Sequence, residues 1–288
     1  MTPIGCGQIT WRGVPEPEVL DDIASAGYDG APPKLGVDRS ATETLDLYAR
    51  HGLRPAPCYF SAPLWRQDLA DEIVADARRA ARFVRELGLT EMYVAPSGDY
   101  VARSGRTRRQ AAGQVEVADG LTDEEFRAVA AVLEAVGGAS LEEGVRSCFH
   151  NHVGTVIESE DEIERLLRLT DPERVFLGPD TGHLAWAGVD VVDFCRRHAG
   201  RIRTMHLKDI DGGVRRRGIV AGWDYDAFAE RGIFAELGEG CVDLPAALQL
   251  LDGAGFSGWL IVETDVTQKP TALESARISR AYLRSVGR

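Results

Sequence analysis

Short apolar runs alternate along this chain with longer segments in which apolar residues recur at helical spacing. In residues 15–26, for example, Val19, Leu20 and Ile23 share one face of a helix, and Gly27 follows where that helix would end. The short runs are continuous rather than alternating, which is typical of strands buried on both faces. The pattern predicts eight strands, at residues 4–10, 28–30, 53–59, 92–95, 146–150, 174–177, 202–207 and 259–262.

Eight helices are predicted in the segments that follow these strands. Their expected ranges are 15–26, 40–50, 71–87, 122–136, 159–169, 189–198, 245–253 and 271–285. Alternating strands and helices form a parallel sheet with right-handed crossovers, and eight such units in 288 residues favour an α/β fold of the (β/α)8 TIM-barrel type. A doubly wound open sheet is the alternative, but no G-x-G-x-x-G follows the first strand. We expect a single domain over residues 1–288.

A polar segment at residues 96–120 interrupts this alternation. Loops of this length in compact domains are commonly lids, binding loops or mobile insertions, so we predict a long loop or lid. It contains several arginines that could hold an anionic substrate or simply be solvated, namely Arg103, Arg106, Arg108 and Arg109.

The composition argues against some classes of partner. The formal net charge is −12 and there is no basic tail, which argues against nucleic acid as a partner. Five scattered cysteines without a C-x-x-C pair fit reduced thiols that fill the core. No basic, apolar leader and no stretch of about 18 apolar residues is visible, so we expect a cytoplasmic protein without membrane contact.

Four of the later predicted strands end on a residue of a type that binds metals. These residues are His150, Asp180, His206 and Glu263. In a TIM barrel the carboxyl ends of the strands meet at one mouth, where active sites lie. Mixed nitrogen and oxygen ligands suit Mn²⁺ or Co²⁺, with Zn²⁺, Fe²⁺ or Mg²⁺ as alternatives. Any one of these residues alone would more often be a helix cap or a surface charge, and it is their recurrence on successive strands that predicts a metal site.

Other polar residues lie close to these ligands in the sequence. His152 is two residues from His150, so in an extended strand both rings would point to the same side. His183 follows Asp180 and either supports the site, orients substrate or caps a helix. Lys208 follows His206 at the same spacing and is either a site residue or part of an ion pair.

Five motifs occur in order, H-N-H-V-G-T, P-D-T-G-H-L-A-W-A-G, M-H-L-K-D, G-E-G-C-V-D-L-P and G-W-L-I-V-E. With them the chain resembles the xylose isomerase-like TIM-barrel superfamily of sugar isomerases and epimerases, and within it most of all the inosose (2-keto-myo-inositol) dehydratases. His150 stands where many epimerases of the superfamily have a metal-binding Glu. The chain departs from these dehydratases in two places: Asn151 interrupts their run of three histidines, and the segment from Gly30 to Lys34 lacks the acid of their G-x-E motif.

The resemblance implies a hydro-lyase for a keto-cyclitol or keto-sugar, acting by proton abstraction next to a metal-polarised ketone and loss of a β-hydroxyl. His152 and Glu263 are then the expected proton-transfer groups. Lys208 and His183 would hold hydroxyls or the developing oxyanion, with Asn151 and Trp186 among the substrate-binding residues, and Trp11 or Trp223 as further walls for the ring.

Three alternatives remain open at this stage. The same site could catalyse isomerisation or epimerisation, which also begin with deprotonation beside a carbonyl. The chain could be a non-catalytic sugar-binding or partner subunit. A DNA-repair nuclease on the same barrel would need more metal ligands and a basic surface. Association into a homo-oligomer is compatible with the sequence.

Overall fold

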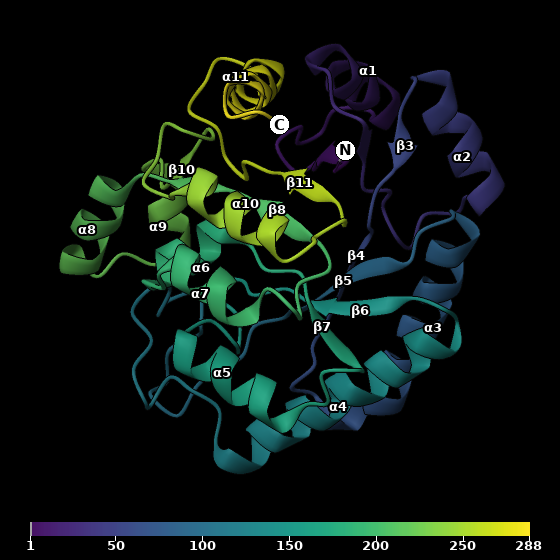
Figure 1. Cartoon of the computed structure of the whole chain (residues 1–288). Coiled ribbons are helices and arrows are strands. Elements are labelled where there is room, and N and C mark those ends of the chain that lie inside the picture. The colour runs from purple at the N-terminus through teal and green to yellow at the C-terminus, as the bar shows by residue number, and fades with distance from the viewer. Residues whose placement is uncertain (1) are drawn as a thin grey trace.

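A closed barrel of parallel strands forms the centre of the computed structural model, which describes residues 2–288 (Figure 1). One set of strands is ordered β3-β2-β1-β11-β8 and another β4-β5-β6-β7. The third barrel strand is split into β3 and β4, because Pro55 and Pro57 each lack a backbone N–H for the ladder. The barrel strands are β1 (Ile4–Cys6), β2 (Gly30–Ala31), β3 (Arg54–Pro55) with β4 (Tyr59–Ala62), β5 (Glu91–Pro96), β6 (Arg146–Phe149), β7 (Val175–Leu177), β8 (Met205–Leu207) and β11 (Leu260–Val262).

The last seam of the barrel lies between β7 and β8. It is closed by two isolated parallel bridges, Leu177 to Ile202 and Asp180 to His206. The prediction of eight parallel strand positions and of an α/β TIM barrel is therefore confirmed. Most strands are shorter than the apolar runs indicated, whereas β5 is longer.

Helices surround the barrel (Figure 1). Those expected from the sequence are α1 (Glu16–Ala26), α2 (Ala41–Arg50), α3 (Ala70–Glu86), α4 (Asp123–Glu142), α5 (Glu160–Leu169), α7 (Val191–His198), α10 (Leu244–Gly253) and α11 (Ala272–Ser285). Helix α4 continues past residue 136, the predicted end, and contains Gly137 and Gly138. A Cβ on Gly137 would lie 2.3 Å from the carbonyl oxygen of Arg174, so glycine lets this helix pack closely on the segment before β7.

Further short elements were not predicted. They are the 3-10 turn η1 (Gln67–Leu69), the helices α6 (Thr181–Ala187), α8 (Gly212–Ala221) and α9 (Tyr225–Glu230), and the antiparallel pair β9 (Asp209–Ile210) and β10 (Phe234–Ala235). Most of them lie in the connections that follow β7 and β8. Helix α6 begins at the residue after Asp180, whose side chain accepts a hydrogen bond from the backbone N–H of His183.

The polar segment at 96–120 is joined to the helices α5 and α9 by ion pairs, one of which is buried. Arg108 is 1% exposed and forms a two-bond ion pair with Glu162. Arg106 pairs with Asp119 and Arg109 with Asp226. Three of the arginines that might have held an anionic substrate are thus neutralised by carboxylates.

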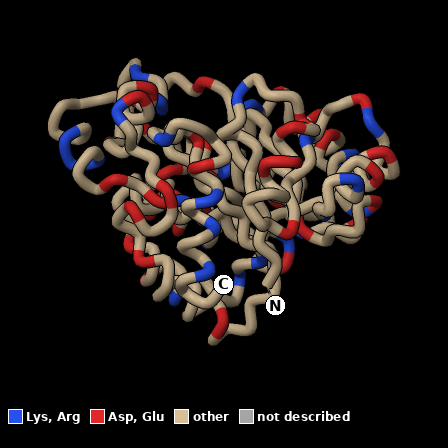
Figure 2. The backbone as a smooth tube through the Cα atoms, turned by 90° about the horizontal axis from the view of Figure 1, so that it is seen from above, with Lys and Arg blue, Asp and Glu red and all other residues tan. Residues whose placement is uncertain are grey.

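Charges and cysteines complete the description. Acidic and basic residues are interspersed along the backbone in Figure 2. The cysteines are free, and four of them are buried as expected, but Cys241 is exposed because it follows the loop after β10. Within residues 2–288, no helix combines the length and the apolar character needed to cross a membrane.

Candidate active site

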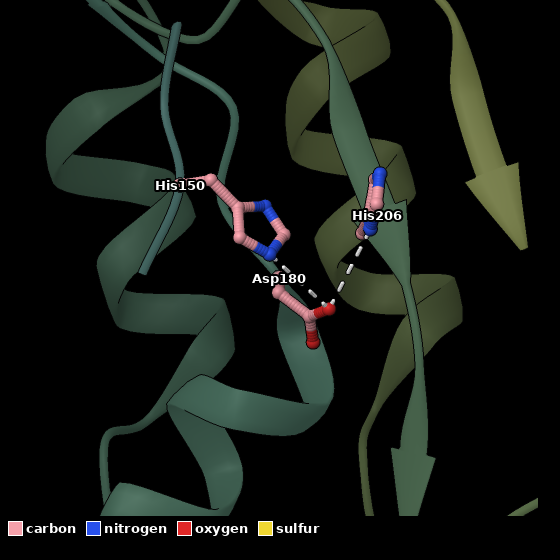
Figure 3. A group of neighbouring side chains, drawn as sticks. All are labelled: His150, Asp180 and His206. Carbon is pink, nitrogen blue, oxygen red and sulfur yellow. Dashed lines mark ion pairs between the residues drawn. The ribbon is translucent and has the colours of Figure 1, made fainter. Parts of the chain in front are cut away.

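Three predicted metal ligands converge at the carboxyl ends of β6, β7 and β8 (Figure 3). The side chains of His150, Asp180 and His206 point toward one another. Oδ2 of Asp180 lies 3.9 Å from Nε2 of His150 and 3.7 Å from Nδ1 of His206. All three residues are almost fully buried. One ligand atom from each lies within 4.8 Å of the others, which is close enough for a single ion to contact all three.

Hydrogen bonds leave the lone pairs of the two histidines free. Nδ1 of His150 lies 3.1 Å from the carbonyl oxygen of Gly178, so it carries the proton and Nε2 faces Asp180. Burial, and then the neighbouring His206, lower the pKa of His150 well below its ordinary value, which keeps the imidazole neutral. Within the described chain, neither ring nitrogen of the buried His206 has a hydrogen-bond partner. Unpaired buried nitrogens of this kind are what a missing ion would satisfy.

Glu263 is the fourth predicted ligand and follows β11. Its Oε2 lies 3.2 Å from Nδ1 of His206. Burial opposes ionisation of this carboxyl group, but His206 and Lys208 outweigh it and lower the pKa of Glu263 to about 2. Gly7, after β1, leaves room for this side chain, since a Cβ on Gly7 would lie 2.1 Å from Oε1 of Glu263.

Lys208 is the only ammonium group among three carboxylates at this site. Its Nζ lies 3.2 Å from Asp180, 3.4 Å from Glu263 and 2.6 Å from Asp265. Burial disfavours the ammonium form, but these three carboxylates outweigh it and raise the pKa of Lys208 well above its ordinary value. Three carboxylates therefore face one ammonium group. Because buried charges need partners, a divalent cation fits the cluster in charge as well as in donor type.

A second group of side chains adjoins the first. Single donor atoms of His152, His183 and Asp265 also lie within 4.8 Å of one another. The rings of His152 and His183 are 3.7 Å apart. Nδ1 of His152 lies 2.7 Å from the carbonyl oxygen of Val153, so this nitrogen carries the proton and Nε2 is free to accept one. Burial, and then Lys208, lower the pKa of His152.

The two histidines of the H-N-H motif therefore have separate surroundings. Strand β6 ends at Phe149, before either residue, and their ring centroids are 6.4 Å apart. Both still line the same cavity, whose volume is about 910 Å³. His206, Glu263, Asp265 and Tyr59 also line it, together with residues after β1 and β2.

Two residues expected to bind substrate lie elsewhere. Asn151 is buried and uses its amide on the backbone of Asp180, accepting from its N–H at 3.0 Å and facing its carbonyl at 3.4 Å. Trp186 is fully buried among Tyr225, Phe228 and Phe234. Neither is among the residues lining the cavity, and His183 is not among them either. Asn151 positions a proposed ligand, Trp186 packs behind His183, and substrate binding by these residues stays a prediction.

Comparison with known proteins adds to this geometry. The family described as xylose isomerase-like TIM barrel matches residues 20–286. The chain belongs to the xylose isomerase-like TIM-barrel family. Its relatives in this family include an inosose dehydratase of Geobacillus thermodenitrificans (strain NG80-2), 29% identical over 98% of this chain and 96% of the relative. The rhizopine catabolism protein MocC of Rhizobium meliloti is 32% identical over 91% of this chain and 81% of its own length.

Solved structures of other proteins share the fold. An L-ribulose 3-epimerase superposes with a TM-score of 0.71 at 19% identity, over 99% of this chain and 94% of the other. The IolI protein, solved with a zinc atom, superposes with a TM-score of 0.71 at 16% identity, over 99% and 97% of the two chains. At these identities the likeness concerns the fold.

The sequence interpretation of this barrel missed Asp265. It stands two residues after Glu263, in E-T-D, and is 4% exposed. Its carboxylate contacts Lys208 and lies 3.4 Å from the hydroxyl of Tyr225. The same spacing that drew attention to Lys208 after His206 would have indicated Asp265 after Glu263. The contribution of Gly7 and Tyr59 had no comparable signal.

Proposed function

We propose that this chain is a divalent-metal-dependent dehydratase for a keto-cyclitol or keto-sugar. His150, Asp180, His206 and Glu263 are the proposed ligands. The observation that carries the proposal is the buried cluster itself: within the described residues the ring nitrogens of His206 have no hydrogen-bond partner, and three carboxylates face one ammonium group. Relatives named inosose dehydratase, similar over almost the whole chain, favour dehydration among the reactions that such a site can support.

The donor set favours a first-row ion bound by imidazole and carboxylate. Mn²⁺ or Co²⁺ is our first expectation, with Zn²⁺, Fe²⁺ and Mg²⁺ as alternatives. When bound, such an ion supplies Lewis-acid chemistry, polarising a ketone and stabilising negative charge on its oxygen.

His152 is the proposed base. Its Nδ1 is engaged by the carbonyl oxygen of Val153 and the residue lines the cavity, so Nε2 can accept the proton from the carbon beside the ketone. The imidazolium formed there lies close to Asp265, which favours the charged form. The hydroxyl on the next carbon then leaves with its bonding electrons and takes the proton from the imidazolium of His152, so that water and an unsaturated ketone, as its enol or enone, are the products and His152 is neutral again.

The remaining polar groups prepare this step. Glu263 is ionised, so it can ligate or accept a proton but is not a donor at neutral pH. Lys208 balances part of the charge of Asp180, Glu263 and Asp265, and its ammonium group is oriented by them rather than by solvent. We propose that it holds the carboxylates in place and stabilises negative charge on the substrate.

Product analysis tests the proposal. Purified protein loaded with Mn²⁺ or Co²⁺ is incubated with inosose and with 3-keto-glucose, and ultraviolet absorption and mass are followed. We expect a conjugated product lighter by one water. An epimer or an aldose of unchanged mass would replace the dehydratase by an isomerase or epimerase. Binding of metal and polyol without any reaction would favour the sugar-binding subunit.

A further inference from the structure

The cavity extends well beyond the metal cluster. Loops after β1 and β2 form another part of its wall, and most of their side chains there are apolar, among them Ile9, Trp11, Val14, Pro32, Pro33 and Leu35. Ile9 is 45% exposed and Val14 is 36% exposed. We take the polar ligands and these apolar side chains to be two chemically different ends of one space.

A second cavity continues from this wall. It has a volume of about 530 Å³ and shares Lys34, Leu35 and Tyr59 with the first. Phe60 and Phe83 line it together with Val37, which is 41% exposed. Exposed apolar side chains therefore line both cavities, and groups of exposed apolar residues commonly mark a binding surface.

This arrangement does not suit an unsubstituted polyol ring. Such a ring has hydroxyl groups on nearly every carbon, and hydroxyls placed against proline, isoleucine and leucine lose their hydrogen bonds to water without replacement. Clefts of about 300–1,000 Å³ usually enclose ligands of drug size, and the first cavity alone measures about 910 Å³. The ligand end has room for the keto ring, which leaves the apolar end for another group.

We propose that the substrate is a keto-sugar or keto-cyclitol that carries an apolar, ring-sized substituent, as an aryl glycoside does. The keto ring lies at the His150, Asp180, His206 and Glu263 end, and the substituent lies against Ile9, Val14 and Leu35. This inference rests on the proposed function and specifies its substrate class.

Two cations also line the first cavity. Arg12 and Lys34 are exposed, and neither has a carboxylate partner within ion-pair distance in residues 2–288, as the ion pairs of the chain show. Cations of this kind pack on the faces of aromatic rings, which agrees with an aryl substituent. A phosphate ester is the competing ligand, since it too would attract them.

Binding of unreactive probes tests the inference without turnover. Calorimetry compares phenyl β-glucoside, methyl β-glucoside and glucose 6-phosphate on the metal-loaded protein. We expect the phenyl glucoside to bind about tenfold more tightly than the methyl glucoside, because its ring leaves water for an apolar wall. Equal affinities for the two glucosides, or tightest binding of glucose 6-phosphate, would overturn the inference.

Variants locate the subsite. Ile9→Ser and Leu35→Ser should each weaken phenyl glucoside binding about fivefold while leaving the methyl glucoside unchanged. Val220→Ser is the matched control, since Val220 is 90% exposed on α8 and lines neither cavity. An equal loss in all three variants would contradict the placement.

The outcomes for this inference and for the proposed function can be told apart. If the protein dehydrates inosose but binds the phenyl glucoside no more tightly than the methyl glucoside, the proposed function stands and the inference is refuted. Tight binding of phenyl glucoside, with no reaction of its 3-keto form, would support the apolar subsite and refute the dehydratase.

Discussion

Asp180 and His206 are joined by a parallel backbone bridge, and their side chains approach one another to 3.7 Å between Oδ2 and Nδ1 (Figure 3). The backbone N–H of His206 donates to the carbonyl oxygen of Pro179. The closing seam of the barrel thus sets the distance between two proposed ligands. Asp180 also caps α6 through Oδ1. An Asp180→Asn variant can keep this cap, because an asparagine oxygen accepts the same hydrogen bond.

Metal content is the first prediction. Wild-type protein should hold about one divalent ion per chain after reconstitution, and Asp180→Asn and His206→Ala should each lose it, because both remove a donor from a buried cluster. Elemental analysis after gel filtration measures this. His198→Ala is the control, since His198 lies on α7 and pairs with Glu164 outside the cluster. Full metal retention in both ligand variants would disprove the site.

Loss of the proposed base should separate catalysis from metal binding. His152→Ala is expected to lower turnover by about 10²-fold or more, the usual size of an acid–base contribution, with the metal content unchanged. The rate at which the dehydrated ketone forms, together with elemental analysis of the same sample, provides the check. Added imidazole should restore part of the turnover. A variant as active as the wild type would remove His152 from the mechanism.

The close approach of Gly7 to Glu263 makes a third prediction. In Gly7→Ala the new Cβ would meet Oε1, Cγ and Cδ of Glu263 at 2.1, 2.6 and 2.8 Å, so the carboxylate must move away from His206. We expect metal affinity to fall about tenfold or more, the effect of disturbing a ligand's support, and stability to fall by about 1–3 kcal/mol. Titration with Mn²⁺ measures the affinity.

Gly200→Ala is the matched control for this substitution. No heavy atom lies within 4 Å of a Cβ built there, and metal affinity should stay at the wild-type value. If Gly7→Ala binds metal as tightly as this control, Glu263 is not held by the geometry described above.

The buried carboxyl group of Glu158 leads us to predict that the free energy of unfolding depends on pH. Its two carboxylate oxygens accept from the backbone N–H groups of Gly113 and Gly154, and so join the loop at 96–120 to the segment after His152. Burial nevertheless raises the pKa of Glu158 from 4.5 to about 7. Between these pH values the native protein keeps a proton that the unfolded chain has lost, so its stability falls as the pH rises.

The size of this effect follows from the shift in pKa. The wild type should lose about 3 kcal/mol of unfolding free energy relative to Glu158→Gln as the pH rises from 4.5 to 7, and nothing further above that range. Urea unfolding of both proteins at a series of pH values measures the difference. Exposed Glu124→Gln should parallel the wild type. A constant difference between wild type and Glu158→Gln would contradict the raised pKa.

The periodicity of the sequence was enough to predict the barrel and the position of its mouth. Strand-like runs and helical segments alternate clearly, and parallel strands must bring their carboxyl ends to one side. For this reason His150, Asp180 and His206 could be grouped from residues that are far apart in the chain. The predicted end of the helix at residue 136 was wrong. Gly137, the next residue, is a contact point between α4 and Arg174.

Only the tertiary structure decided where the side chains beyond the strand ends point and which groups they contact. His150 and His152 differ because the chain leaves β6 before reaching them, and loop dihedrals rather than strand alternation set their directions. The partners of Lys208 come from the ends of two strands, Asp180 after β7 and Glu263 and Asp265 after β11. Asn151 turns to the backbone of Asp180. Sequence patterns follow local backbone geometry, whereas these contacts depend on how distant segments meet in space.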